Sequence, residues 1–347
     1  MKRILSMVLI MSLTVFAFAG CSDKPAETTE DTPAVTENAV KTGLAVISSA
    51  EKSVDAADED GIAQVDSVAV AVMVDADGKI LKAEIDTAQT KVNFSKEGKL
   101  TTDKAMEFKS KQELGTEYGM AAASTIGKDW AEQANAFETF VEGKTVEEIK
   151  TFSLDEETHL TDADMTASVT IKVGPYIEAI EKAVTNAQDI GASATDKLGL
   201  GLETTIEKSA DFDAAESKDG LAQVYTYYTA STFAEDGVIT SSLIDASQTN
   251  INFDATGKIT TDLTAALQSK NELGDAYGMK SASSIGKEWN EQADAFSKYV
   301  VGKTSEEVSG IAVDADGHAT DADVTASVTV GIAEFQTVVA KAFATAK

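Results

Sequence analysis

Thiol and imidazole groups are scarce in this sequence, which has one cysteine and two histidines among 347 residues. A single thiol excludes an intramolecular disulfide and a thiolate metal cluster. Basic residues are also few, because 29 lysines and arginines stand against 58 aspartates and glutamates, for a formal net charge of −29. Such a chain repels phosphate backbones, so we expect no nucleic-acid partner. No nucleophile–base triad, phosphate loop or dinucleotide fingerprint is found in the sequence.

The first 20 residues have the pattern of a secretion signal. A short basic segment precedes an apolar run from residue 4 to residue 18, too short to span a bilayer stably. The run closes on Phe-Ala-Gly directly before Cys21, which has the form of a lipobox. We predict a signal peptide at 1–20 and a lipid anchor on Cys21, which would hold the protein on the extracytoplasmic face of the cell membrane. The alternative is an ordinary signal peptide followed by an incidental cysteine.

Residues 21–41 are rich in Thr, Glu, Asp, Ala and Pro and contain few large apolar side chains. Such a segment cannot bury enough surface to offset the entropy lost on ordering, so we predict a flexible, lipid-anchored tether. The remaining chain, about 300 residues, is long enough for two domains.

The second half of the chain repeats the first at an offset of 159 residues. Glu113-Leu-Gly returns as Glu272-Leu-Gly, and nearly half of the positions from 61 to 187 match their partners without a gap. A period this long indicates a duplicated domain and not a solenoid. We predict two copies, at 42–190 and 191–347.

Each copy has the same expected order of elements. Amphipathic patterning predicts a short opening helix, at 44–54 and again at 202–210. β-Branched and aromatic runs predict strands, joined by an Asp-Gly hairpin turn and followed by two shorter strands. In the first copy the strands are expected at 65–74, 80–86, 92–94 and 99–101, with the turn at Asp77-Gly78; in the second, the first two are expected at 224–233 and 239–245.

The second part of each copy is predicted to be helical. Apolar residues recur every three or four positions from Ile126 to Val141, and Gly143 ends this helix. Thr145 has the spacing of a capping box with the glutamate three residues later, and a last helix begins at Pro175. The predicted class is α+β, with two tandem copies of a small antiparallel sheet and packed helices.

A short block near the end of each copy is retained most completely. Thr161-Asp-Ala-Asp is followed, after one free position, by Thr166-Ala-Ser-Val-Thr, and the block returns at 320–329. With the order of elements, it resembles the FMN-binding domain family, found in the flavin subunits of respiratory quinone reductases and in flavinylated extracytoplasmic lipoproteins. Those domains carry an acidic residue, then Ser-Gly-Ala-Thr, then an amphipathic helix. The family's last threonine bears FMN through a phosphodiester, which a flavin transferase forms.

The resemblance implies which residues would hold the flavin. The acidic position matches Asp162, the alanine matches Ala167, and the flavin-bearing hydroxyl falls on Ser168; their counterparts in the second copy are Asp321, Ala326 and Ser327. Two positions depart from the family, since its serine and glycine become Met165 and Thr166, and Val324 and Thr325 in the second copy. A glycine at this position would give a turn without a side chain and so open the hydroxyl to a transferase and a bulky flavin. Thr166 and Thr325 remove that opening.

The same block has a second interpretation. Apolar and polar residues alternate from 166 to 173, which is the period of a half-buried strand. The serine hydroxyls would then face solvent or the ladder of a neighbouring strand. They are not nucleophiles by themselves, because no base lies near them in the sequence.

The two histidines are equivalent, since His159 and His318 each lie nine residues before the predicted flavin-bearing serine. A contact to flavin or phosphate is one interpretation, and a surface-loop histidine is the other. One histidine per copy is thin for a transition-metal site. The Asp-Gly clusters at 75–78 and 314–317 lack the spacing of a calcium loop, so we predict turns there and no metal. Trp130 and Trp289 could wall a planar ligand, with core packing as the alternative.

These patterns predict a membrane-tethered, extracytoplasmic lipoprotein that carries FMN and transfers electrons, served by a flavin transferase and a redox partner. An electron carrier is expected rather than a turnover enzyme, because the cofactor performs the redox step and the domain holds it. The alternative is a non-catalytic cell-surface lipoprotein that binds a small ligand or a protein partner without flavin. Met165 and Thr166 favour the alternative, whereas the order of elements and the retained Asp, Ala and Ser favour flavin.

Overall fold

The structure is a computed structural model that describes residues 39–347. The predicted signal peptide, Cys21 and almost all of the tether lie outside the described residues. The described residues belong to one compact unit. The predicted α+β class is confirmed, because each copy contains a three-stranded antiparallel sheet with helices packed on it.

Each copy opens with an antiparallel meander whose second strand lies in the centre of the sheet. The turn between the second and third strands is the predicted Asp-Gly hairpin, in which Gly78 has a φ of 78°. The first sheet consists of β1 (Lys41–Ser49), β2 (Gly61–Val74) and β3 (Ile80–Phe94), and the second of β4 (Lys197–Thr205), β5 (Gly220–Phe233) and β6 (Ile239–Phe253).

The opening helices predicted at 44–54 and 202–210 are wrong, because those segments lie largely in the strands β1 and β4. Both faces of β1 are buried: Leu44 faces the other sheet, while Ala45 packs beneath a helix layer. A segment buried on both faces has no polar side, and its apolar spacing therefore resembles that of a helix. Helix and strand approach closely here, since a Cβ on Gly199 would come 1.9 Å from the carbonyl oxygen of Ala342.

The third and fourth predicted strands are also corrected. Residues 92–94 are the end of β3, which continues without interruption from residue 80. Residues 99–101 form no strand of their own, and Leu100 makes a single bridge back to Phe94. The pairing of β3 with β2 continues to Phe94, so the predicted second and third strands are parts of one long strand.

The helical parts match the predictions more closely. Gly143 follows α2 in a left-handed conformation, Thr145 forms the predicted capping box, and Pro175 lies in the first turn of α5. The first copy contains α1 (Lys111–Leu114), η1 (Gly115–Tyr118), α2 (Trp130–Val141), α3 (Val146–Ile149), α4 (Ala163–Thr166) and α5 (Gly174–Thr185). The second contains α6 (Lys270–Leu273), η2 (Gly274–Tyr277), α7 (Trp289–Val300), α8 (Ser305–Ser309), α9 (Ala322–Thr325) and α10 (Ala333–Thr345).

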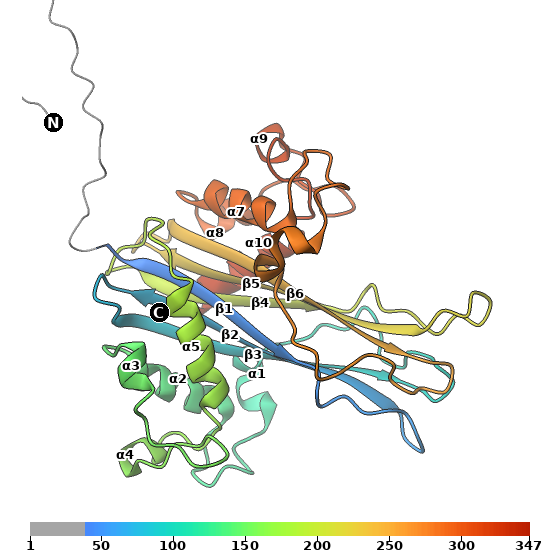
Figure 1. Cartoon of the computed structure of the whole chain (residues 1–347). Helices are drawn as coiled ribbons and strands as arrows, with labels where there is room; N and C mark the ends of the chain where they lie inside the picture. The colour runs from blue at the N-terminus through green and yellow to red at the C-terminus, as the bar shows by residue number, and fades with distance from the viewer. Residues whose placement is uncertain (1–38) are drawn as a thin grey trace, which may run out of the picture. The chain divides into compact units, whose positions relative to one another are not determined.

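The elements form four layers (Figure 1). Helices α2 and α5 cover the outer face of the first sheet, and α7 and α10 cover the outer face of the second. The inner faces of the two sheets pack on each other, and Ala71 and Met73 of β2 share a buried cluster with Leu200 and Tyr228. Because β2 is buried on both faces, it reads in the sequence as an almost continuous apolar run.

Contacts between the copies occur in equivalent pairs. Lys182 Nζ of the first copy lies 2.7 Å from Glu272 Oε1 of the second, and Lys341 Nζ of the second lies 2.7 Å from Glu113 Oε1 of the first. Each lysine and each glutamate is 159 positions from its counterpart. Reciprocal contacts of this kind are those of a two-fold dimer, so the copies are related by a pseudo-two-fold axis.

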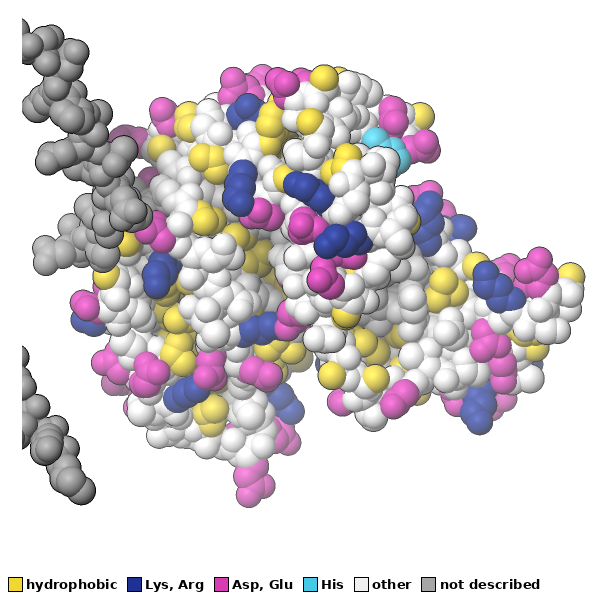
Figure 2. Space-filling model, turned by 45° about the horizontal axis from the view of Figure 1, so that its top comes forward, with side chains coloured by type: hydrophobic (Ala, Val, Ile, Leu, Met, Phe, Trp, Pro, Cys, Tyr) yellow, Lys and Arg dark blue, Asp and Glu magenta, His cyan; other side chains and the backbone are white. Residues whose placement is uncertain are grey.

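The surface agrees with the acidic composition. Acidic side chains are spread over the face in Figure 2, with lysines among them. Among residues 39–347, no helix has the length and apolar character needed to cross a membrane.

Candidate functional site

The predicted flavin-attachment block forms a one-turn helix and not a strand. Asp162 begins α4, and its carboxylate accepts the backbone N–H of Asp164 at 2.9 Å. The N–H of Ser168 donates to the carbonyl of Met165 at 3.0 Å, which closes the turn. The second copy repeats this arrangement, with Asp321 beginning α9. The acidic residue of the block therefore fixes the turn that carries Ala167 and Ser168.

The strand interpretation of residues 166–173 is wrong for a specific reason. The backbone N–H of Thr170 does not enter a ladder but donates to the side-chain oxygen of Gln133 at 2.8 Å. Gln133 lies on α2 and is fully buried. In the second copy Gln292 accepts the N–H of Thr329 in the same way, at 2.7 Å. A buried glutamine thus satisfies the backbone that a neighbouring strand would otherwise pair with.

The Ser168 hydroxyl is half-buried at the end of this turn, beside a cation. Lys128 Nζ lies 3.5 Å from Ser168 Oγ. In the second copy Lys287 stands at the position equivalent to Lys128, and Ser327 Oγ donates to the carbonyl of Val324 at 3.4 Å. The alanines next to the serines, Ala167 and Ala326, are exposed.

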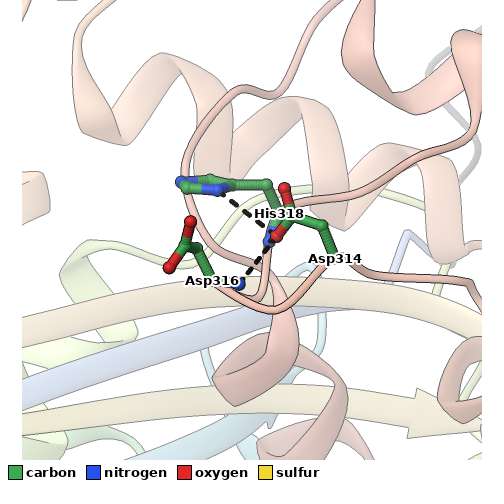
Figure 3. Close-up of side chains that lie close together, drawn as sticks. All are labelled: Asp314, Asp316 and His318. Atoms are coloured by element: carbon green, nitrogen blue, oxygen red, sulfur yellow. Dashed lines mark hydrogen bonds and ion pairs between the residues drawn. The ribbon is translucent and has the colours of Figure 1, made fainter.

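Both histidine rings lie beside an aspartate of their own loop, and that of His159 is within hydrogen-bond distance. His159 Nδ1 lies 3.1 Å from Asp155 Oδ2, and His318 Nδ1 lies 3.6 Å from Asp314 Oδ1 (Figure 3). The backbone of His159 forms a bridge with Lys172. The histidines thus lie in a loop before the serine turn, and these contacts of their rings are made within that loop.

Trp130 and Trp289 are core residues. Trp130 is buried, and its indole N–H donates to the hydroxyl of Tyr176 at 2.9 Å. Trp289 packs edge-to-face on Phe335, with ring centroids 5.6 Å apart. The core interpretation of both tryptophans is confirmed, since both are buried among other core side chains.

Two cavities lie between the copies, and the sequence did not indicate them. One of about 260 Å3 is lined by residues that include Leu44, Asp245 and Leu243, and one of about 270 Å3 by residues that include Leu200, Asp86 and Glu84. The lining positions are equivalent: Leu44 with Leu200, Asp245 with Asp86, Asn271 with Gln112, Glu272 with Glu113, Asn186 with Thr345, Gln188 with Lys347, and Leu243 with Glu84.

The second cavity carries a buried charge cluster that the first lacks. Lys347 Nζ lies 2.6 Å from Glu138 Oε2 and 3.2 Å from Glu84 Oε2. Both glutamates are buried, and burial raises the pKa of each carboxyl. The ammonium of Lys347 opposes this shift without cancelling it. The repeat itself contained a signal for this cluster, since Glu84 stands where the second copy has Leu243.

Each cavity has one buried aspartate in its lining, Asp245 in the first and Asp86 in the second. Asp86 Oδ1 accepts the backbone N–H groups of Thr87 at 2.7 Å and Gln112 at 3.0 Å. Asp245 makes the equivalent bonds in the second copy. Burial raises the pKa of each carboxyl to about 6. The hydrogen bonds favour the charged carboxylate and so lower the pKa, but burial has the larger effect. Their bonds anchor the start of α1 and α6 to the edge of each sheet.

Lys270 is a second buried group that the sequence reasoning missed. Its ammonium lies 5.0 Å from the ring centroid of Trp289 and donates to the hydroxyl of Tyr277 at 2.6 Å and to that of Tyr225. Burial lowers the pKa of Lys270 to about 7. The ammonium of this buried lysine is enclosed by aromatic rings, whose faces attract its charge.

In the first copy the serine turn brings together a hydroxyl and an ammonium, which are groups that suit a phosphodiester. The Ser168 hydroxyl is only half-buried, and Lys128 supplies a cation that would offset the charge of a phosphodiester there. Thr166, which replaces the family's glycine, bonds its hydroxyl to the carbonyl of Ala163 at 3.2 Å and so folds back on its own turn. The two cavities between the copies include neither serine. A flavin ring attached to Ser168 would therefore not be held by those cavities.

Comparison with known proteins gives one partial likeness. No protein-family model matches the chain, and no solved structure matches it. A protein named chlorophenol reductase, from Desulfitobacterium hafniense, is 28% identical over 155 residues, which are 37% of this chain and 44% of that protein. The chain thus spans less than half the length of this curated relative.

Proposed function

We propose that this protein is an extracytoplasmic electron carrier, tethered to the membrane through Cys21, that bears flavin on Ser168 and Ser327. One observation carries the proposal: the candidate hydroxyl ends an Asp-capped helical turn in both copies, and in the first copy an ammonium lies 3.5 Å from it. A residue in the interior of a sheet could not present a hydroxyl to a transferase in this way. The name of the partial relative, a reductase, supports a redox role.

The residues of the turn have separate tasks in this proposal. Asp162 fixes the start of the turn, Gln133 holds the segment that follows it, and Lys128 offsets the charge of the phosphodiester. A bound flavin would supply the redox chemistry itself. The chain contributes position and charge, and Met165 of α4 packs against the core of its copy.

The proposal is tested with the full chain from its native host, in which the transferase is present. We expect Ser168→Ala and Ser327→Ala each to remove one FMN unit from the intact mass, and the double variant to remove both. Thr166→Ala is the matched control, because it removes a hydroxyl from the same turn and should leave the mass increase unchanged. Serine variants that keep the full flavin mass would contradict the assignment.

The two cavities between the copies favour a second candidate, a surface lipoprotein that binds a small ligand without flavin. Each cavity has a buried carboxyl in its lining, Asp86 or Asp245, together with amide groups. Native mass spectrometry of the chain from its host distinguishes the candidates. A non-covalent adduct lost on denaturation supports ligand binding, whereas a flavin adduct that survives denaturation supports the carrier.

A further inference from the structure

The loop between α8 and α9 holds three potential metal ligands at the surface. Asp314 Oδ1 accepts the backbone N–H groups of Asp316 and His318, both at 2.9 Å, which folds the loop into a tight turn. The N–H of Ile332 donates to the carbonyl of Gly317 at 2.7 Å and ties this turn to the segment before α10. The ligand atoms of Asp314, Asp316 and His318 all lie within 4.8 Å of one another (Figure 3).

The first copy shows what a cation does in the equivalent loop. There Lys172 Nζ lies 3.2 Å from Glu157 Oε2, so the chain supplies its own cation. Glu157 is the counterpart of Asp316, and the counterpart of Lys172 is Gly331, which brings no charge. The second copy thus keeps two of the three acidic residues and the histidine of this loop, with Ala315 in place of Glu156, but it has no lysine like the one that pairs with Glu157.

A further carboxylate increases the negative charge in the second copy. Glu334 Oε2 lies 3.9 Å from the place that a Cβ of Gly331 would occupy, and the carbonyl of Asp316 lies 3.6 Å from the same point. In the first copy the counterpart of Glu334 is Pro175. Loss of the lysine and gain of Glu334 each make this surface more negative by one charge, and the loss of Glu156 offsets one of them, so the net change is one charge in the direction that attracts a cation.

We propose that Asp314, Asp316 and His318 form a divalent-metal site that only the second copy possesses. Two carboxylate oxygens and one imidazole nitrogen are ligands that Zn2+ accepts, and water would complete its coordination. The side chains are exposed and can close on the ion by rotation. We predicted no metal here from the sequence because the histidine and the Asp-Gly cluster were considered separately. In the structure the turn brings Asp314 and Asp316 close to His318.

The two histidines make a direct test possible, because each copy contributes one imidazole signal to the proton NMR spectrum. The full chain is titrated with ZnCl2 at pH 7.5. We expect the ring resonances of His318 to shift while those of His159 stay in place. Assignment comes from His318→Gln and His159→Gln, of which only the first should remove the responding signal.

The decisive variant is Gly331→Lys, which restores the lysine of the first copy. A side chain is tolerated there, because the nearest atom to an added Cβ is 3.6 Å away and the backbone lies outside the left-handed region. We expect Gly331→Lys to weaken the Zn2+ response of His318 at least about tenfold. An unchanged response in this variant, an equal shift of both histidines, or no shift at millimolar Zn2+ overturns the proposal. Circular dichroism of each variant confirms that the fold is retained.

Discussion

Phe94 stacks face to face on Phe253, with ring centroids 4.2 Å apart and planes inclined by 5°. The two residues are 159 positions apart and end equivalent strands, β3 and β6. A residue can contact its own counterpart only where it lies on the axis that relates the copies. The pair therefore marks the pseudo-two-fold axis. Both rings are fully buried, within a cluster to which both copies contribute.

Truncation of this pair should be costly. We expect Phe94→Ala or Phe253→Ala to lower the free energy of unfolding by about 3–5 kcal/mol, because each leaves a cavity in a closed core. The double variant should cost less than the sum, by about 0.5–1.5 kcal/mol, since the stacking is lost only once. Urea denaturation measures all three values. Phe343, which is 47% exposed, is the matched control, and Phe343→Ala should cost clearly less. Strict additivity would show that the rings do not stabilise each other.

Separation of the copies should expose an apolar sheet face. Leu198, Leu200, Leu202 and Tyr228 of the second copy are covered by the first copy. We expect residues 191–347 alone to self-associate, and the separately produced copies 42–190 and 191–347 to form a one-to-one complex when mixed. Analytical ultracentrifugation distinguishes the species. Two folded monomers that do not bind each other would contradict the interpretation that the inner sheet faces form a shared core.

The Asp-Gly hairpin turns and the ends of the long helices agree with the sequence prediction, because each depends on local patterns. The sequence prediction failed at β1 and β4, where the other copy buries one face of the strand and the helices of the same copy bury the other. The strand interpretation of residues 166–173 failed for a related reason. The backbone N–H of Thr170 donates to the side-chain oxygen of Gln133, which lies 37 positions away in the sequence. Local alternation does not reveal a distant side chain that replaces a strand neighbour. Resemblance pointed to the two serines, but the one-turn helix before each of them was not predicted.

Asp86 should make stability depend on pH. Burial raises its folded-state pKa to about 6 from the usual 3.8, so the folded protein binds this proton more tightly than the unfolded chain does. The resulting stability is present below about pH 4 and is lost as the pH rises through about 6, with a total of about 3 kcal/mol. Asp86→Asn can still accept both N–H bonds at Oδ1. We therefore expect this variant to exceed the wild type in stability at pH 8 and to match it near pH 4.

Asp245 provides an internal repeat of the measurement, because its pKa is raised to about 6 by the same burial. Asp245→Asn should show the same sign and a similar size. Chemical denaturation at several pH values, with the wild type measured in parallel, isolates each aspartate from the other titrating groups. A variant less stable than the wild type at pH 8 would show that the charge is favourable in place.

Lys347 should stabilise the protein only while its partners are charged. Burial raises the pKa of Glu84 to about 9 and that of Glu138 to about 7, so Lys347→Met leaves chiefly an ionised, buried Glu138 without a cation at pH 8. We expect a loss of about 2 kcal/mol at pH 8, below the 3–5 kcal/mol typical of a fully buried pair because the lysine side chain is half exposed. At acidic pH, where both carboxyls are protonated, the loss should vanish.

The second copy offers the matched control for this cluster. Glu84→Leu, Glu138→Ser and Lys347→Gln together copy the residues Leu243, Ser297 and Gln188. This triple variant should be at least as stable as the wild type, since it removes charges and partners together. A triple variant less stable than Lys347→Met would contradict the interpretation that burying these three charges destabilises the fold.

The central claim is that this chain bears flavin on Ser168 and Ser327. The most direct measurement is the intact mass and visible spectrum of the wild-type protein, purified from its native host and denatured before analysis. The account predicts a yellow protein whose denatured mass exceeds that of the lipidated polypeptide by two FMN units. A colourless protein with the mass of the lipidated polypeptide alone would contradict it.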